Sequence, residues 1–200
     1  KLLDVNHKQD YRIIGQLFDT YWLIEFEDSF YMMDQHAAHE KILYERLMKQ
    51  FHEKTYHSQM IMPPVILTLS LREEQILKEN WKTFTALGYE IEEFGGKEYK
   101  VTGLPAELPT VIDCKQLLIE LIDTIADESA THDPERITEK VASMSCKAAV
   151  KGNNRLSFKE AEELMRELME AENPYNCPHG RPTLIKMTKY EIERKFKRIL

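Results

Sequence analysis

The pattern of apolar and polar residues at the start of the chain predicts a small antiparallel sheet. Three runs rich in aromatic and β-branched residues, 12–18, 21–26 and 30–33, are separated by short polar turns. Residues 34–50 change to the period of a helix, because apolar side chains recur three and four positions apart. The first fifty residues are therefore predicted to form a three-stranded meander followed by one helix.

The middle of the chain carries a separate set of predicted elements. Residues 51–64 are expected to be irregular and to end at two prolines. The expected elements after them are a strand at 65–69, a helix at 72–87, a hairpin of strands at 89–94 and 98–104, and a helix at 114–127. Because this set can build its own core, residues 53–128 are interpreted as an inserted, smaller lobe.

The end of the chain is mostly helical. The expected elements are a helix from Pro134 to Ala149, a helix from Ser157 that ends at Asn173-Pro174, a short strand at 183–187 and a helix at 188–199. Ser157 with Glu160, and Thr188 with Glu191, form capping boxes at two helix starts. The mixed order of strands and helices predicts an α+β fold, with residues 1–52 and 129–200 in one lobe.

Composition narrows the function classes. The chain has 200 residues, 42% of them hydrophobic and 30% charged, which is ordinary for a globular protein and argues against disorder. Its apolar runs are far shorter than a bilayer requires, so no membrane association is expected. The chain begins at Lys1 without a signal-peptide pattern, and we expect it to be part of a longer protein.

Charge and cysteine content restrict the partners and the compartment. The formal net charge is −7, so the chain lacks the overall basic balance of a duplex-binding domain. Either DNA is not a partner or another protein brings it, although residues 189–198 form a local basic stripe. Three cysteines, Cys114, Cys146 and Cys177, do not suggest a disulfide framework. A reducing compartment, in which thiols can bind metals or pack in a core, fits better.

The first candidate for chemistry is the run from Asp34 to Glu40. His36 and Glu40 are four residues apart, so on a helix they share a face and can bind one cation or two adjacent ones. Asp34 precedes them at the junction of strand and helix. The alternative is that Asp34 is only an N-cap and that His36 and Glu40 are only a solvated pair.

The second candidate is the proline-framed segment around Cys177 and His179. Both side chains can face one metal, and a rigid loop loses less entropy when it binds. Arg181 is expected to contact phosphate or to pair with an acid. The alternative is a turn with a partly buried cysteine.

The third candidate is Cys146 in a predicted helix. It is either a metal ligand or, more commonly for such a position, a small core residue. Lys147, Lys151 and Arg155 follow it and form a basic patch for a phosphate backbone, or else a solvated helix end.

Together the three segments offer thiolates, imidazoles and carboxylates. Imidazole and thiolate suit zinc, whereas a carboxylate with open coordination suits manganese or magnesium. Two adjacent metals are a common arrangement for in-line attack on a phosphodiester. The sequence alone does not show that the segments meet.

The chain resembles the C-terminal domain of MutL-type DNA mismatch repair proteins of the nicking class. Asp34-Gln35-His36-Ala37, with Glu40 and Glu45, matches the D-Q-H-A-x-x-E-x-x-x-x-E motif of the endonuclease-active members. Three further segments are similar to the remaining motifs of the family and come in the same order: Ser145-Cys146-Lys147, Cys177-Pro178-His179-Gly180-Arg181-Pro182 and Phe196-Lys197-Arg198. The short spacers are similar to those of the bacterial homodimers, so the resemblance implies a bacterial protein that is located in the cytoplasm.

The resemblance implies roles for these residues. The metal ligands would be His36, Glu40, Cys146, Cys177 and His179, and the catalytic carboxylates Asp34 and Glu40. Zinc would be structural or regulatory, and manganese would support latent nicking of duplex DNA. DNA contacts are assigned to Lys147, Lys151, Arg155 and Arg181. The lobe of the two chain ends would form the homodimer, and the inserted lobe would be regulatory. The ATPase of the family lies upstream, and the mismatch-recognition protein MutS would act through the full-length protein.

The family also carries a segment that binds the processivity sliding clamp. Gln59, Ile61, Met62 and Pro64 fit its pattern, except that Met62 stands where leucine or isoleucine is usual and Pro63 occupies the fifth position. The alternative is a loop that packs Ile61 and Met62 into its own core. A clamp threaded on DNA would deliver an acidic nuclease that binds DNA weakly by itself.

Two other functions fit parts of the pattern. The chain could be a non-catalytic dimerisation scaffold stabilised by zinc, although a purely structural site needs no additional acids such as Asp34 and Glu45. A zinc hydrolase of another class is disfavoured, because the chain has no H-E-x-x-H sequence. Dimerisation itself is also suggested by the aromatic, methionine-rich first sheet and the apolar last helix.

Overall fold

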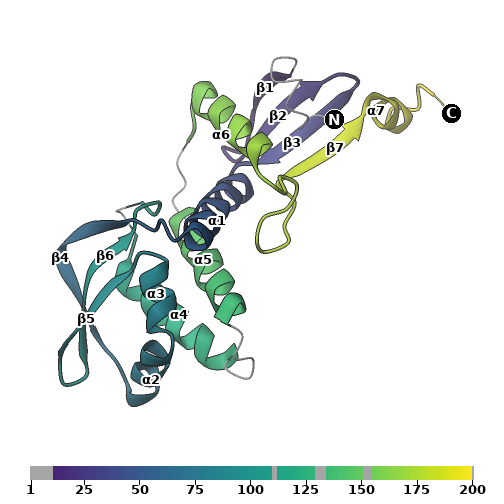
Figure 1. The fold of residues 1–200 in the computed structure, drawn as a ribbon. Helices are drawn as coiled ribbons and strands as arrows, with labels where there is room; N and C mark the ends of the chain where they lie inside the picture. Colours follow the sequence, from purple (N-terminus) through teal and green to yellow (C-terminus); the bar gives the residue numbers. More distant parts are fainter. Residues whose placement is uncertain (1–10, 110–111, 129–133, 151–154, 200) are drawn as a thin grey trace. The chain divides into compact units, whose positions relative to one another are not determined.

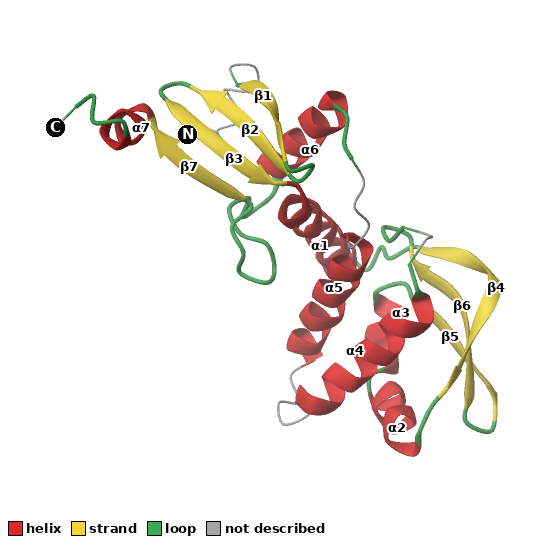
Figure 2. Ribbon diagram, turned by 180° about the vertical axis from the view of Figure 1, so that it is seen from behind, coloured by secondary structure: helices red, strands yellow, loops and turns green. Residues whose placement is uncertain are grey.

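The structure is a computed structural model that describes residues 11–109, 112–128, 134–150 and 155–199. The chain divides into two compact units, Lys1–Ile42 with Val150–Leu200, and Leu43–Ala149. Each unit contains one antiparallel sheet, as the yellow strands in Figure 2 show. The protein is therefore α+β, as predicted. The expected boundaries, 52/53 and 128/129, both fall inside the second unit, which is wider than the predicted insertion.

The first unit is built on a four-stranded sheet with the order β1-β2-β3-β7 (Figure 1). Its elements are β1 (Arg12–Leu17), β2 (Tyr21–Phe26), β3 (Ser29–Asp34), the start of α1 (Gln35–Glu53), α6 (Phe158–Glu170), β7 (Leu184–Thr188) and α7 (Lys189–Lys195). All neighbouring strands are antiparallel. The predicted meander is confirmed, and β7 extends it by pairing with β3.

The inner face of this sheet carries the core of the first unit. Alternate residues of β2 and β3 are buried, as expected for a sheet with one covered face. Helix α6 packs an apolar stripe onto them, and the Trp22 ring meets Phe158 edge-on with centroids 5.3 Å apart. The buried members from the sheet and α6 are Trp22, Ile24, Phe26, Tyr31, Met33, Ala161, Leu164, Met165, Leu168, Met169 and Leu184.

The outer face of the same sheet is also apolar, but its residues are only partly buried. Leu23 lies opposite Met32, and Met32 lies opposite Ile185, so the three side chains form a row across β2, β3 and β7. Phe30 and Met187 form the next pair. Ile185 is 51% exposed. A soluble sheet usually turns polar residues outward, so this face is suited to a further contact.

The second unit has a three-stranded sheet with the order β4-β6-β5. Its elements are the end of α1, β4 (Ser58–Thr68), α2 (Leu71–Glu79), α3 (Trp81–Ala86), β5 (Glu90–Gly95), β6 (Glu98–Pro105), α4 (Cys114–Glu128) and α5 (Pro134–Val150). Helix α4 packs against both α2 and β4 (Figure 1). The predicted hairpin around Gly95-Gly96 is confirmed as β5 and β6.

Three expectations about individual elements were wrong. Residues 58–64, predicted to be irregular, belong to β4. This strand tolerates Pro63 and Pro64 because it lies at a sheet edge and its pairing shifts register between Met60 and Val65. The helix predicted at 72–87 is two helices, because the Asn80 side chain donates to the Ile76 carbonyl at 2.9 Å and ends α2.

The last helix is the third correction. It was predicted to reach residue 199 but ends at Lys195. Phe196 is its C-cap, and Lys197 has a φ of 53°, in the left-handed region that interrupts a helix. Phe196 is 74% exposed.

Helix α1 contributes to the cores of both units. Ala38 and Ile42 belong to the first core, and Leu47 and Met48, on the following turns, belong to the second. The residues of the first candidate site therefore lie at one end of α1, and the other end of this helix packs in the core of the second unit. In the parts of the chain that the structure describes, no helix has the length and apolarity needed to span a bilayer.

Candidate metal centre

The site begins where β3 ends and α1 starts. The Asp34 Oδ1 atom accepts backbone N–H groups of His36 at 2.9 Å and Ala37 at 3.1 Å. Asp34 is therefore the N-cap of α1, which was the structural alternative drawn from the sequence. The capping interaction fixes a carboxylate at the positive end of a helix.

Gln35 holds this junction in place. Its side-chain Oε1 accepts hydrogen bonds from Trp22 Nε1 and Gln16 Nε2, each at 3.2 Å. Gln35 is only 3% exposed. The motif around Gln35 predicts no separate role for this residue. The available signal is Trp22, because a buried indole N–H needs an acceptor.

The loop between α6 and β7 supplies the second part of the site. The Cys177 N–H donates to the Arg181 carbonyl at 2.8 Å, and the Gly180 N–H donates to the Cys177 carbonyl at 2.9 Å. Asn176 and Pro182 form a bridge that closes the loop. Gly180 has a φ of +77°, which a side chain would disfavour. This tight turn fixes the backbone on either side of His179.

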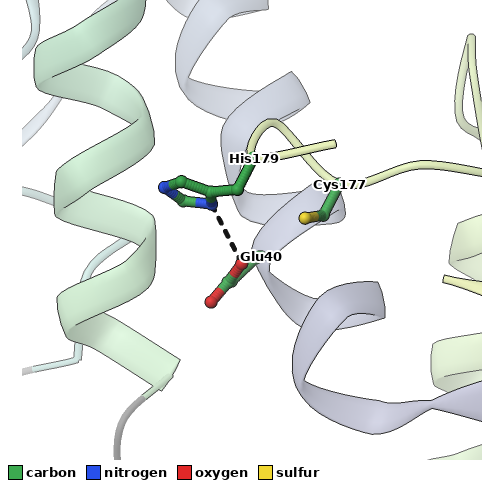
Figure 3. Close-up of side chains that lie close together, drawn as sticks. All are labelled: Glu40, Cys177 and His179. Atoms are coloured by element: carbon green, nitrogen blue, oxygen red, sulfur yellow. Dashed lines mark hydrogen bonds and ion pairs between the residues drawn. The ribbon is translucent and has the colours of Figure 1, made fainter. Parts of the chain in front are cut away.

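Glu40, Cys177 and His179 converge, as Figure 3 shows. One ligand atom from each lies within 4.8 Å of the others. The His179 Nδ1 atom is 3.2 Å from Glu40 Oε2, and the Glu40 side chain is 5% exposed. A carboxylate oxygen, a thiol sulfur and an imidazole nitrogen form a donor set that suits zinc, and three ligands leave a coordination position open. The residues present therefore fit a metal ion.

Arg181 completes the cluster in a way that the sequence left open. Its Nη2 atom donates to Glu40 Oε2 at 2.5 Å, so Arg181 pairs with an acid. The hydrogen bond to Glu40 is the main cause that raises the pKa of Arg181. The guanidinium thus contacts one member of the three-residue group, Glu40.

Two of the five predicted metal ligands are not in this group. The His36 Nδ1 atom lies 4.0 Å from Asp34 Oδ1, so its nearby partner is the capping carboxylate. Cys146 is fully buried on α5 and belongs to the core of the second unit, which was its alternative role. Among the residues that the structure describes, only Glu40, Cys177 and His179 satisfy the distance condition for a shared ion. Glu45 is half-buried on α1 in the second unit.

The predicted DNA contacts are dispersed. Lys147 is exposed on α5, and Lys151 lies outside the described residues. Arg155 is exposed but forms an ion pair with Asp19 at 3.0 Å. Since Arg155 and Arg181 both face carboxylates, their charge is partly neutralised within the first unit.

The segment predicted to bind the clamp lies on β4. The Gln59 side-chain amide donates to the Pro105 carbonyl at 3.1 Å and also to the Leu108 carbonyl, so the side chain is held by its own unit. Ile61 packs partly into the core, as the alternative proposed, but Met62 is 78% exposed. An open pocket of about 530 Å³ adjoins the segment and is lined by Met60, Met62, Leu104 and Ile112, among others.

Comparison with known proteins identifies the chain's relatives. Residues 14–156 match the family described as the MutL C terminal dimerisation domain. The DNA mismatch repair protein MutL of Agathobacter rectalis is 54% identical over 96% of this chain and 30% of its own length. The protein of the same name from Caldanaerobacter subterraneus is 39% identical over 98% of this chain and 33% of its own length. The chain therefore spans about a third of the length of these relatives.

Proposed function

Because this chain belongs to the MutL C-terminal dimerisation domain family, we propose that it is also a metal-dependent DNA-nicking endonuclease domain in mismatch repair. The observation that carries the proposal is the convergence of Glu40, Cys177 and His179 near the capped start of α1. An oxygen, sulfur and nitrogen donor set with an open position is characteristic of a catalytic rather than a closed zinc site.

The residues of the first unit have distinct proposed roles. Glu40, Cys177 and His179 would hold zinc, and His36, one turn before Glu40 on α1, is a further proposed ligand. A bound divalent ion, zinc or the manganese expected for activity, would polarise a phosphodiester and lower the pKa of a bound water. Asp34 would accept a proton from the attacking water, with its carboxylate oriented by two backbone N–H groups.

The catalytic assignment is tested with Asp34→Asn. Asparagine caps helices about as well as aspartate, so the variant should stay folded while the carboxylate is lost. We expect nicking of a supercoiled plasmid with manganese to fall by about 100-fold or more, in the range of a lost general base. Asp123→Asn, at an exposed position of α4, is the matched control and should nick as the wild type does. Nicking by Asp34→Asn at the wild-type rate would remove Asp34 from the mechanism.

We propose that the outer face of the first sheet is the surface through which two copies dimerise. The family match gives the chain a dimerisation role, and the row of Leu23, Met32 and Ile185 supplies a partly exposed apolar surface. Burying such side chains stabilises an interface by about 25 cal/mol per Å² of apolar area, before the entropy of association is subtracted.

A charged residue in that row tests the interface. Ile185→Glu should convert the dimer to a monomer in light scattering, because it would place a carboxylate between two apolar faces. Leu71→Glu introduces the same charge at another exposed apolar residue, in the second unit, and should remain dimeric. A dimeric Ile185→Glu protein would place the interface elsewhere.

We propose a sliding clamp as a partner of the β4 segment. The exposed Met60 and Met62 beside the pocket are the proposed anchors, whereas the Gln59 amide is already engaged within the unit. Met62→Glu should therefore weaken clamp binding in surface plasmon resonance more than Gln59→Ala does. Phe94→Glu, at another exposed apolar residue of the same unit, is the control. Equal binding by Met62→Glu and wild type would exclude this anchor.

The remaining partners are proposals for the whole protein. An upstream ATPase domain, duplex DNA, MutS acting through the full-length chain and a bacterial cytoplasmic location all follow from the kinship with MutL. The second candidate function is a dimerisation scaffold stabilised by zinc. The ion pair between the buried Glu40 and Arg181 favours it, because a carboxylate that already has a partner can stabilise the fold without taking part in a reaction. Zinc binding without nicking under any metal would support the scaffold.

A further inference from the structure

Arg181 places a positive charge beside Glu40, one of the proposed metal ligands. Its guanidinium donates to Glu40 Oε2 at 2.5 Å. His179 Nδ1 approaches the same Oε2 atom at 3.2 Å. The candidate ligand Glu40 therefore already has a positively charged partner supplied by the chain.

The burial of Glu40 explains why a cation is needed there. The Glu40 side chain is 5% exposed, and a buried carboxylate without a positive or hydrogen-bonding partner is strongly destabilising. The guanidinium fulfils this requirement when no metal is bound. A divalent ion at the same oxygen would fulfil it too, but the two cations would repel one another at such short range.

The geometry allows the side chain to leave while the loop stays in place. The Arg181 side chain is 50% exposed, so it has access to solvent. The backbone of the loop is fixed independently, by the bond from the Cys177 N–H to the Arg181 carbonyl and by the bridge between Asn176 and Pro182. Rotation about the side-chain bonds of Arg181 would therefore break its contact with Glu40 without moving the backbone of the loop.

We propose that Arg181 is an exchangeable internal counter-ion, which must leave Glu40 before a divalent metal can bind there. The proposal rests on the proposed metal site. Arg181 thereby sets the affinity of the site and keeps the metal-free domain folded. Once displaced, the guanidinium stands beside the metal centre, where it can pair with a phosphate.

The test is a zinc titration against a chromophoric chelator, with wild type, Arg181→Gln and Arg155→Gln. Arg181→Gln should bind zinc about tenfold more tightly than wild type, since the competitor is gone; tenfold corresponds to about 1.4 kcal/mol. Arg155→Gln removes an arginine that is paired with Asp19 in the same unit, and its zinc affinity should equal that of wild type. Arg181→Lys keeps a positive charge, and its zinc affinity should lie between those of wild type and Arg181→Gln.

Thermal unfolding separates competition from simple structural support. Without zinc, Arg181→Gln should unfold at a lower temperature than wild type, because Glu40 loses its partner. With saturating zinc the difference should disappear. If Arg181→Gln proves too unstable to titrate, the Nε–H resonance of Arg181 in wild type should move on addition of zinc towards that of a solvated arginine.

The outcomes distinguish this proposal from the one on which it rests. If wild type binds zinc and Arg181→Gln binds it equally or more weakly, the exchange is wrong while the metal site stands. An Arg181 resonance that zinc leaves unchanged would also overturn the exchange. If neither protein binds zinc, both proposals fail.

Discussion

At the scale of single residues, individual side chains supply the hydrogen-bond and ion-pair partners of the buried polar groups in each unit. In the first unit, Glu40 is compensated by Arg181 and His179. In the second, the Tyr89 hydroxyl lies 2.6 Å from Ser145 Oγ, and Ser145 donates to the Val141 carbonyl at 2.6 Å, so Tyr89 is the donor of the pair. Such buried groups are stable only while their partners are present.

The Tyr89–Ser145 hydrogen bond should show energetic coupling. Tyr89→Phe and Ser145→Ala are each expected to lower the free energy of unfolding by about 1–3 kcal/mol, because each leaves a buried polar atom without its partner. The double variant should lose less than the sum, by about 0.5–3 kcal/mol. Urea denaturation of the four proteins measures the cycle, and additive losses would mean that the two hydroxyls do not interact.

Cys114 should be a poor nucleophile in the folded protein. Burial, and to a smaller extent the Asp113 carboxylate, raise its pKa from 9.0 to about 11. The folded state therefore favours the neutral thiol, a preference that is fully present below pH 9 and is lost as the pH rises through about 11. Alkylation by iodoacetamide, followed by mass spectrometry, should be slow at pH 7.5 and should rise steeply towards pH 11. Urea should abolish the protection, and rapid labelling of the folded chain at neutral pH would contradict it.

The site was predictable in part, for reasons that individual residues make clear. Residue type and spacing made Glu40, Cys177 and His179 candidate ligands, and the resemblance to the MutL family assigned them to one metal site, but the spacing did not show that the segments meet. Spacing did not show that Arg181 turns towards Glu40, since that depends on the fold of the loop. Likewise, the indole N–H of Trp22 requires an acceptor if it is buried, but nothing in the sequence near Gln35 showed that the Gln35 side-chain oxygen would be that acceptor.

At the scale of elements, several helix starts are fixed by reciprocal side-chain caps. Among the residues that the structure describes, three helices begin with a capping box: α2 with Ser70 and Glu73, α6 with Ser157 and Glu160, and α7 with Thr188 and Glu191. The cap of α6 bears most directly on the site, because the loop that carries Cys177 follows this helix. The cap and the buried stripe together hold α6 on the sheet.

Loss of the α6 cap should therefore destabilise the first unit. Ser157→Ala is expected to lower the free energy of unfolding by about 1 kcal/mol, because the Glu160 N–H loses its acceptor. Ser157→Thr, which retains the hydroxyl, should cost much less and serves as the control. Chemical denaturation gives both values; equal losses for the two variants would show that the hydroxyl is not the cause.

Local sequence rules account for most elements and fail where tertiary pairing decides. The strands 21–26 and 12–18 and both predicted capping boxes follow from alternation and from side-chain chemistry next to the helix. The rules failed at β4, where Pro63 and Pro64 argued for a loop while an edge position accepted them. They also failed at Asn80, because its side chain competes for a carbonyl within the helix.

At the scale of the whole molecule, the chain has two sets of buried side chains and a surface suited to a second copy. The two cores, as described, share no residue. The partly buried outer face of the first sheet belongs to the first unit alone. Association of two copies would therefore act directly on the stability of that unit.

Thermal stability should consequently depend on protein concentration. A 100-fold increase in concentration should raise the unfolding temperature of wild type, since up to about 2.7 kcal/mol of mass-action stabilisation becomes available. Ile185→Glu should show no such dependence, because its outer face would no longer associate. Differential scanning calorimetry at the two concentrations measures the unfolding temperatures of both proteins. A wild-type transition that does not shift would contradict the proposed dimer.

The single helix α1 has a consequence for how the gene can change. Its first turns carry His36 and Glu40, and the same turns bury Ala38 and Ile42 in the core of the first unit. One inserted or deleted codon between Ala38 and Ile42 would turn these two side chains against one another by about 100°. Insertions and deletions in this stretch should therefore be eliminated by selection even where substitutions survive, and a library of single-codon insertions should show a sharp gap there.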